Sequence, residues 1–313
     1  MSSVIEEFVF EGHYGTAHVY RSVLKSVHEY ACRNFLMEDM TPTFLKGYEN
    51  YLIYYKGRQW NTSSTYMRCL QTVYNRAVDL ELTPYFPRQF KGVFTGTKRN
   101  HQRSLSVENV REVLIEKDES VEREDKPVQR HLTEKARACL ELMLRFQGMP
   151  FVDLAFLRKN DLKNGYLVLR RHKTQTPLYI RISKEAMNLL RKYGNNDLNS
   201  PYLLDILDGH LTGYEAYQNY QSKLRQVNQG LRRLAVDHHL PVSLSTYCAR
   251  HTWATQAKYC GVPTEVISEG LGHASVTTTE AYLKSFENGV LDYANEVVMK
   301  YIFKNKRAKK MFA

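Results

Sequence analysis

The sequence predicts a mainly α-helical chain made of two domains, with a small β-sheet or hairpin in the second domain. Apolar residues recur at helical spacing along most of the chain, which indicates amphipathic helices. Only two short runs are rich in β-forming residues, and both lie in the second half of the chain. Between the halves, residues 91–102 are basic and poor in large apolar side chains, as expected of a linker. A chain of 313 residues is long enough for two ordinary cores.

The first domain, residues 1–103, is expected to be a compact helical unit. Three amphipathic helices are predicted there, at Ala17–Phe35, Pro42–Tyr55 and Ser63–Leu80. Thr41 directly before Pro42 is a helix-start signal, because a threonine side chain can cap the helix and proline fits its first turn. Lys98 and Arg99 lie in the basic stretch that follows, and they are candidate contacts to an anionic surface.

The second domain, residues 104–313, is expected to place a small sheet among helices. Tyr166–Arg170 and Leu178–Ile182 are the two β-rich runs, and the polar residues between them predict a hairpin turn. Ser106 and Ser183 are suited to cap helices that follow them. Helices are predicted at Leu105–Lys117, Leu132–Phe146, Lys184–Tyr193, Tyr217–Ala235 and about Leu291–Phe303.

Three polar residues between positions 247 and 282 are the best candidates for chemistry. Arg250 can hold a phosphate bidentately with a fixed charge. His273 can donate a hydrogen bond or move a proton near neutral pH. The oxygen of Tyr282 can form a covalent intermediate. Together the three residue types could serve phosphoryl transfer without a metal ion.

The local pattern predicts that these residues lie on two helices and a turn. Apolar residues around Arg250 recur at helical spacing, so the arginine is expected on an amphipathic helix that ends at Gly261. A short second helix should follow, and Gly272 should let the chain turn at His273. The run Thr277–Thr279 can cap a further helix. Taken one at a time, these residues are more often structural than catalytic. An Arg-His pair on a helix is usually solvated or caps the helix, and a tyrosine near a helix start usually packs against other side chains.

The joint pattern resembles the tyrosine recombinase or phage integrase family. Arg250-His251-Thr252, Leu271-Gly272-His273, and Tyr282 nine positions after the histidine follow the order and spacing of that family. The resemblance implies a SAM-like core-binding domain followed by a catalytic domain with the DNA breaking-rejoining fold. It also implies that Tyr282 attacks a DNA phosphodiester and forms a 3′-phosphotyrosyl link, while Arg250 and His273 hold the non-bridging oxygens. His251 is then a DNA-binding residue.

The resemblance extends to the turn of the predicted hairpin. Lys173 matches the catalytic lysine of the family, whose role is to protonate the departing 5′ oxygen. Arg171 and His172 are then neighbours of the DNA. The alternative for Lys173 alone is an ordinary exposed lysine in a turn.

The sequence departs from the family at the first of its two arginines. In a branch known from mobile elements and invertible promoters of gut bacteria, this segment reads Arg-Gly-Met-Ser-Phe-Val-Asp, and Gln147 stands where that arginine is expected. Arg145 is the nearest substitute, although two residues along a helix turn a side chain to another face. Tyr247 replaces a common histidine or lysine, occurs in the same branch, and could orient a phosphate oxygen.

The resemblance therefore predicts a site-specific recombinase for integration and excision or for inversion, and an enzyme that needs no cofactor. Because one arginine is missing, the alternative is a recombinase-derived protein that binds DNA with impaired or lost cutting. A third possibility is relaxation of supercoils by the same chemistry, as in type IB topoisomerases. Recombination of two duplexes requires a tetramer on DNA, and the free protein is expected to be a monomer.

Composition fits a partner that is double-stranded DNA. The formal net charge is +11 and the isoelectric point is about 9.3, which favours an anionic partner. The five cysteines form no CxxC pair, so neither a metal site nor a disulfide framework is expected. Glu6 and Glu7 stand where a signal peptide would carry positive charge, and no apolar run has the length of a membrane span. We expect a cytoplasmic, nucleoid-associated bacterial protein.

Overall fold

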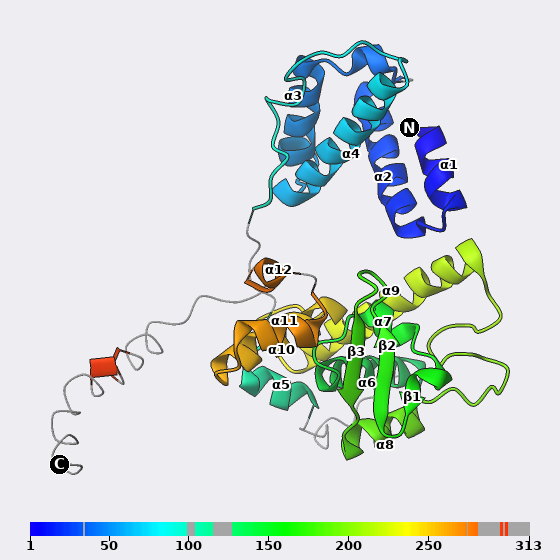
Figure 1. Ribbon diagram of the computed structural model, residues 1–313, viewed down its shortest axis with the longest axis vertical. Helices are drawn as coiled ribbons and strands as arrows, with labels where there is room; N and C mark the ends of the chain where they lie inside the picture. Colours follow the sequence, from blue (N-terminus) through cyan, green and yellow to red (C-terminus); the bar gives the residue numbers. More distant parts are fainter. Residues whose placement is uncertain are drawn as a thin grey trace, which may run out of the picture. The chain divides into compact units, whose positions relative to one another are not determined.

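The computed structural model describes residues 1–33, 35–98, 104–114, 127–273 and 275–280, together with Asn295, Glu296, Val298 and Met299. The chain divides into two compact units (Figure 1). The first contains residues 1–101 and 207–222, and the second contains residues 102–206 and 223–313. The described parts of both units are mostly helical, and the second unit holds one small antiparallel sheet. The fold class predicted from the sequence is confirmed.

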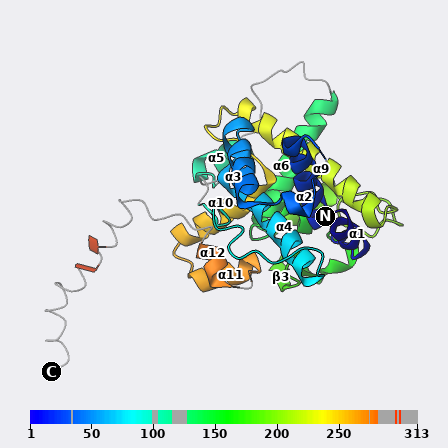
Figure 2. The same cartoon turned by 90° about the horizontal axis from the view of Figure 1, so that it is seen from above.

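The first unit is built on helices that pack side by side (Figures 1 and 2). They are α1 (Ser2–Phe10), α2 (Tyr14–Ala31), α3 (Pro42–Asn50), which a π-helical turn extends over Tyr51–Tyr55, and α4 (Trp60–Asp79). The predicted cap is confirmed, because the Thr41 hydroxyl accepts the Phe44 N–H at 3.2 Å. Helix α1 was not predicted, and α4 begins three residues earlier than expected. Helix α2 ends at Ala31 rather than at Phe35, since Cys32 adopts a left-handed conformation.

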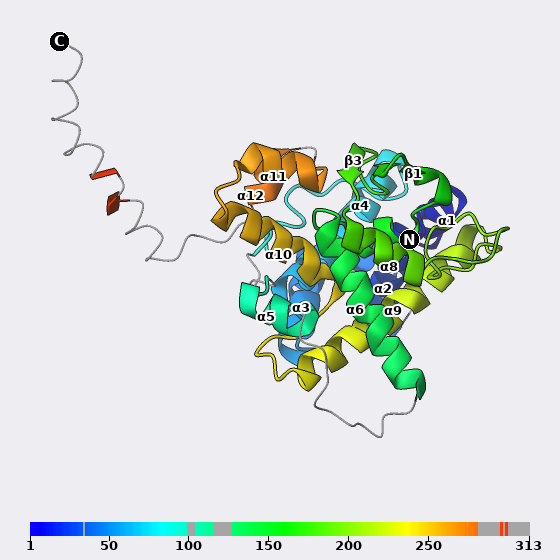
Figure 3. The same ribbon diagram turned by 90° about the horizontal axis from the view of Figure 1, so that it is seen from below.

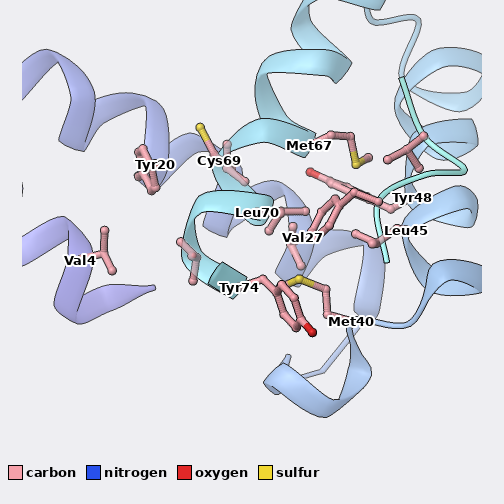
Figure 4. Packing of buried hydrophobic residues seen from close by; sticks show 14 of the residues in the cluster. Val4, Tyr20, Val27, Met40, Leu45, Tyr48, Met67, Cys69, Leu70 and Tyr74 are labelled. Atoms are coloured by element: carbon pink, nitrogen blue, oxygen red, sulfur yellow. The ribbon is translucent and has the colours of Figure 1, made fainter. Parts of the chain in front are cut away.

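The core of this unit lies where α2, α3 and α4 meet (Figure 4). Val27, Leu45, Tyr48, Met67 and Leu70 are each almost fully buried there. Burial of one such side chain contributes about 1.5–3 kcal/mol, so this cluster is enough to hold the helices together.

The stretch expected to be a linker is partly fixed on the first unit. The carboxylate of Glu49 is buried, binds the Lys46 ammonium at 2.6 Å and accepts the Phe94 N–H at 2.6 Å. The Asn61 side chain exchanges two hydrogen bonds of 2.7 Å with the backbone of Lys98. The chain up to residue 98 therefore bonds to α3 and α4, so this part of the stretch predicted to be a linker is held on the first unit.

The sheet of the second unit consists of β1 (Leu162–Lys163), β2 (Tyr166–Arg170) and β3 (Pro177–Arg181) in the order β1-β2-β3, all antiparallel. The predicted hairpin is confirmed, with β3 beginning one residue earlier than expected, and β1 is an addition. Leu167 pairs with Ile180 across the hairpin, and both side chains are buried. The turn at residues 171–176 therefore lies at one end of the sheet. One face of the sheet is buried within the unit.

Helices pack beside this sheet (Figures 1 and 3). The Ser106 and Ser183 hydroxyls cap α5 and α8 by accepting N–H groups at 3.2 Å, as predicted. The helix expected near residues 291–303 falls outside the described residues except for the four named above. The helices are α5 (Val107–Leu114), α6 (Pro127–Arg145), α7 (Phe151–Ala155), α8 (Lys184–Lys192), α9 (Gly213–Asp237, whose first turns belong to the first unit), α10 (Thr246–Tyr259), α11 (Thr264–Leu271) and α12 (Val276–Glu280).

Two kinds of feature are absent from the described residues. Within those ranges no helix is both long and apolar enough to cross a membrane. In the same part of the chain, no three histidine, cysteine or acidic side chains are grouped so that they could bind a metal ion.

Candidate active site

Helix α10 is fixed in the second unit by its buried face. Ala254 of α10 packs against Ile267 and Leu271 of α11, and all three are fully buried. On the same helix the Thr252 hydroxyl accepts the Leu105 N–H at 2.9 Å, which ties α10 to the segment before α5. Thr252, part of the Arg-His-Thr pattern, therefore has a structural contact that the sequence did not predict.

Arg250 points from α10 into the protein rather than into solvent. Only 4% of the residue is exposed. Its guanidinium donates to the Gly148 carbonyl at 3.3 Å and to the Leu271 carbonyl at 2.6 Å. Gly148 has φ of +68°, and a Cβ there would lie 3.1 Å from the Arg250 Cα, so a side chain at position 148 would push the loop away from α10. The close approach of this loop aims the guanidinium at the end of α11.

The hairpin brings a second arginine to the same carbonyl. Arg171 follows β2, is 5% exposed, and donates from Nη1 to the Leu271 carbonyl. Its Nε lies 2.7 Å from Oδ2 of Asp153, a carboxylate buried in α7. The other oxygen of Asp153 accepts the His172 N–H at 2.8 Å. Asp153 thus holds the base of the hairpin turn, and the Leu271 oxygen accepts hydrogen bonds from two guanidinium groups.

Gly272 makes the turn between α11 and His273, as predicted. Its φ of +63° is left-handed, a conformation that glycine adopts without steric penalty. A Cβ on Gly272 would lie 3.0 Å from Cγ and 3.1 Å from Cδ of Arg171. The hairpin also contacts this turn through Thr174, whose hydroxyl donates to the Gly272 carbonyl at 3.3 Å. The turn therefore requires glycine for its conformation and for its contact with Arg171.

Replacement of Gly272 by Ala should lower the free energy of unfolding and slow any reaction at this site. The left-handed backbone alone costs about 1–2 kcal/mol for an L residue. Gly261 offers a matched control, because its φ is +79° while a Cβ there would meet nothing within 4 Å. Chemical denaturation should show a larger loss for Gly272→Ala than for Gly261→Ala. Equal losses would mean that the contact with Arg171 contributes nothing.

His273 is held at this turn as a neutral imidazole. Its pKa is lowered from 6.5 to about 4, first because the ring is partly buried, and then because Arg250, Arg171 and Lys173 lie close enough to repel a proton. The Nδ1 atom lies 2.7 Å from the hydroxyl of Thr279, a fully buried residue of α12. This contact engages Nδ1 and fixes the imidazole ring at the turn.

An NMR titration should show that His273 stays neutral between about pH 5 and pH 8, the range in which an ordinary histidine changes charge. Because the folded pKa lies below 6.5, the unfolded state takes up the proton first, and stability falls as the pH drops from 6.5 towards 4. The His273 ring signals should shift only near the lower end of this window. A midpoint near 6.5 would contradict the surroundings described here.

Four side chains thus gather around the end of α11, and we refer to Arg171, Lys173, Arg250 and His273 as the basic cluster. Three of them were expected to act together, and Arg171 was expected only as a neighbour of DNA. Lys173 is exposed at the tip of the hairpin turn. Tyr282, the expected nucleophile, lies outside the described residues, two positions beyond the end of α12.

The other predicted contact residues lie at several places. His172 is exposed on the hairpin turn, with its ring 5.4 Å from that of Phe156. Tyr247 and His251 form an edge-to-face ring pair at 4.7 Å on α10. In the first unit, the Lys98 ammonium lies 3.9 Å from the centre of the Trp60 ring. Arg99 falls outside the described residues.

Gln147 occupies the expected place of the first arginine, and Arg145 is the nearest possible substitute. The two residues differ in their surroundings. Gln147 lies in the loop after α6 with φ of +57°, and its Oε1 would be 3.5 Å from a Cβ on Gly270 in α11. Arg145 donates instead to the Glu141 carboxylate at 2.8 Å and to the Glu185 carboxylate at 3.4 Å. Within the described residues, Arg145 bonds to no member of the basic cluster.

Comparison with known proteins identifies the family. A family model described as the phage integrase SAM-like domain matches residues 1–93. A second, described as the phage integrase family, matches residues 115–288, which is more than half of the chain. The chain belongs to the phage integrase family. The resemblance seen in the Arg-His-Thr and Leu-Gly-His patterns is thereby confirmed.

Known members resemble this integrase-family chain over part or most of its length. Tyrosine recombinase XerD of Mycobacterium tuberculosis is 28% identical over 168 residues, 50% of each protein, so the chain spans about half of this curated relative. XerH bound to its difH substrate has a TM-score of 0.60 at 18% identity, covering 95% of this chain and 84% of the other. A lambda integrase tetramer on a Holliday junction has a TM-score of 0.55 at 13% identity, covering 87% and 72%. The two structures show a common fold.

Proposed function

We propose that this chain is a site-specific tyrosine recombinase that cuts and rejoins DNA without a metal ion or ATP. One observation carries the proposal: Arg250, His273 and Lys173 meet at the turn after α11. In the sequence, Tyr282 follows two positions after the end of α12, the next helix. Fixed cations and a neutral hydrogen-bond donor at one point suit a phosphate whose negative charge grows during reaction. Nothing in this arrangement requires a metal ion to supply positive charge.

The proposed chemistry is a pair of transesterifications. The Tyr282 oxygen bonds to phosphorus while the bond to the 5′ oxygen breaks, which leaves DNA joined to the protein through a 3′-phosphotyrosine. Arg250 and His273 hold the non-bridging oxygens, and Lys173 gives a proton to the departing 5′ oxygen. A 5′ hydroxyl of the partner strand then attacks the phosphotyrosine and releases Tyr282. One ester is exchanged for another, so no energy source is consumed.

DNA binding should be strongly electrostatic. The net charge of +11 suits a phosphate backbone, and release of counterions should weaken binding steeply as salt rises. The exposed His172, the Tyr247–His251 pair and Lys98 are proposed contacts to DNA. A tetramer on DNA is proposed because two duplexes must be cut, and the lambda integrase tetramer on a Holliday junction supports it. Integration with excision, or inversion, are the proposed biological outcomes. We also propose that the protein is bacterial and acts on DNA in the cytoplasm.

Covalent trapping tests this proposal. The protein is incubated with a library of nicked duplexes and is then denatured. After cutting, the short fragment that carries the 5′ hydroxyl dissociates from the nicked duplex, so the strand cannot be rejoined. A protein–DNA adduct is expected, and sequencing of the attached DNA gives the target site. Salt-sensitive DNA binding without any adduct would instead support the non-cutting alternative. Supercoil relaxation without exchange of strands would support the topoisomerase-like alternative.

A further inference from the structure

The basic cluster lacks one arginine of the family pattern and contains another, Arg171, to which that pattern assigns no catalytic role. That pattern calls for an arginine where Gln147 stands, and the neutral Gln147 side chain does lie beside α11. An arginine at this place would therefore be near the cluster. Its absence removes a positive charge exactly where the reacting phosphate needs one.

Arg171 brings a positive charge to the same place from the hairpin. Its Nη1 and the Nη2 of Arg250 both donate to the Leu271 carbonyl. Because one oxygen anchors both groups, the two guanidinium groups are close enough to bind a single phosphate. Arg171 is as fully buried as Arg250, and Gly272 packs directly against its side chain. The position of the charge is therefore fixed before DNA arrives.

Arg171 also keeps a hydrogen-bond donor that a ligand could use. Two buried cations side by side repel each other, and such pairs are normally offset by anions. Arg171 has one carboxylate partner, Asp153, which contacts its Nε. Its Nη2 makes no hydrogen bond within the described residues, so a donor remains for a ligand. A phosphate between the two arginines could accept a hydrogen bond from this donor and would face two positive charges.

We propose that Arg171 replaces the missing first arginine, and that Arg171 and Arg250 together hold the non-bridging oxygens of the phosphate that is cut. This inference rests on the proposed function. Arg145 does not compete for the role, since its guanidinium is bound to Glu141 and Glu185. Gln147 can offer the phosphate a hydrogen bond but no charge.

Single-turnover cleavage of two substrates tests the role of Arg171. One duplex carries the normal phosphodiester at the cut site, and the other carries a methylphosphonate, in which a methyl group replaces a charged oxygen. Arg171→Gln should cut the phosphodiester roughly 100-fold or more slowly than the wild type. The reacting methylphosphonate carries less negative charge and so needs less positive charge to stabilise it. On that substrate, Arg171→Gln should therefore be slower than the wild type by no more than about tenfold. A merely structural arginine would slow both substrates alike.

Arg170→Gln is the matched control, because it removes the same charge from the neighbouring residue, an exposed arginine that bonds to the Gln175 carbonyl. At saturating protein it should cut both substrates at wild-type rates. If Arg171→Gln fails to fold, Arg171→Lys keeps the cation but lacks the planar fork, so it should slow cutting of the phosphodiester by less than about 100-fold and show a weaker preference for the methylphosphonate than a neutral residue would. Adding Gln147→Arg should restore cutting of the phosphodiester to either variant.

The outcomes separate the two proposals. A wild type that cuts neither substrate overturns the proposed function, and this inference with it. A wild type that cuts, beside an Arg171→Gln protein that is equally fast or is slowed equally on both substrates, overturns the inference alone. A loss confined to the phosphodiester and repaired by Gln147→Arg supports it.

Discussion

Replacement of Tyr282 by Phe should abolish the covalent protein–DNA adduct while DNA binding remains. The substitution removes one oxygen and leaves the ring, so the proposed nucleophile is lost with almost no change in volume. The charges that attract DNA do not involve the phenol, and the affinity should stay within about threefold of the wild type at any one salt concentration. Denaturing gels detect the adduct, and binding is measured in parallel on the same DNA.

Tyr259→Phe is a suitable control for this experiment. Tyr259 is an exposed residue at the end of α10, and its substitution removes the same atom from a tyrosine outside the basic cluster. It should form the adduct as readily as the wild type. An adduct that persists in Tyr282→Phe would mean that another side chain attacks the phosphate.

Replacement of Arg250 by Ala should slow cleavage by roughly 10²–10³-fold, the usual loss when one donor to a developing negative charge is removed. Part of the effect is structural, because the guanidinium also bonds to the Gly148 and Leu271 carbonyls. The Gly148 carbonyl would lose a charged donor, which can cost about 1–3 kcal/mol of stability, whereas the Leu271 carbonyl keeps its hydrogen bond from Arg171. Single-turnover rates at saturating protein, with denaturant unfolding alongside, separate the two contributions.

Arg250→Lys helps to interpret the result. Lysine keeps the charge but lacks the planar fork that serves two acceptors, so its rate should fall between those of the wild type and the alanine variant. Arg191→Ala, which removes an exposed arginine from α8, should leave the rate unchanged. Wild-type cleavage by Arg250→Ala would exclude this residue from the phosphate site.

The parts of the site that depend on local pattern were predictable. Helical spacing predicted the helix that carries Arg250, Gly261 predicted its end, and Gly272 predicted the turn before His273. The hairpin followed from its two β-rich runs. The run Thr277–Thr279 was interpreted wrongly as a helix start, since these residues lie inside α12, which begins at Val276. There Thr279 contacts the His273 ring instead.

The long-range contacts could not be predicted in this way. Arg171 and Leu271 are 100 residues apart, and nothing local indicates that their atoms meet. One signal was present in the sequence. Residues 167, 169 and 171 are two positions apart, so along an extended strand their side chains lie on the same face. Arg171 therefore shares the face of the buried Leu167 and not the face towards solvent. A charged residue on an inner face suggests a partner or a ligand. Asp153 is that partner, and its burial likewise depends on packing between distant segments.

The central claim, that this chain cuts DNA through Tyr282, is tested most directly by mapping the adduct. The trapped protein–DNA complex is digested with protease and nuclease, and mass spectrometry locates the nucleotide that remains on the peptide. The account predicts a nucleotide on Tyr282, attached through its 3′ phosphate. A nucleotide on another residue, attachment through a 5′ phosphate, or no modified peptide from protein that binds DNA would contradict it.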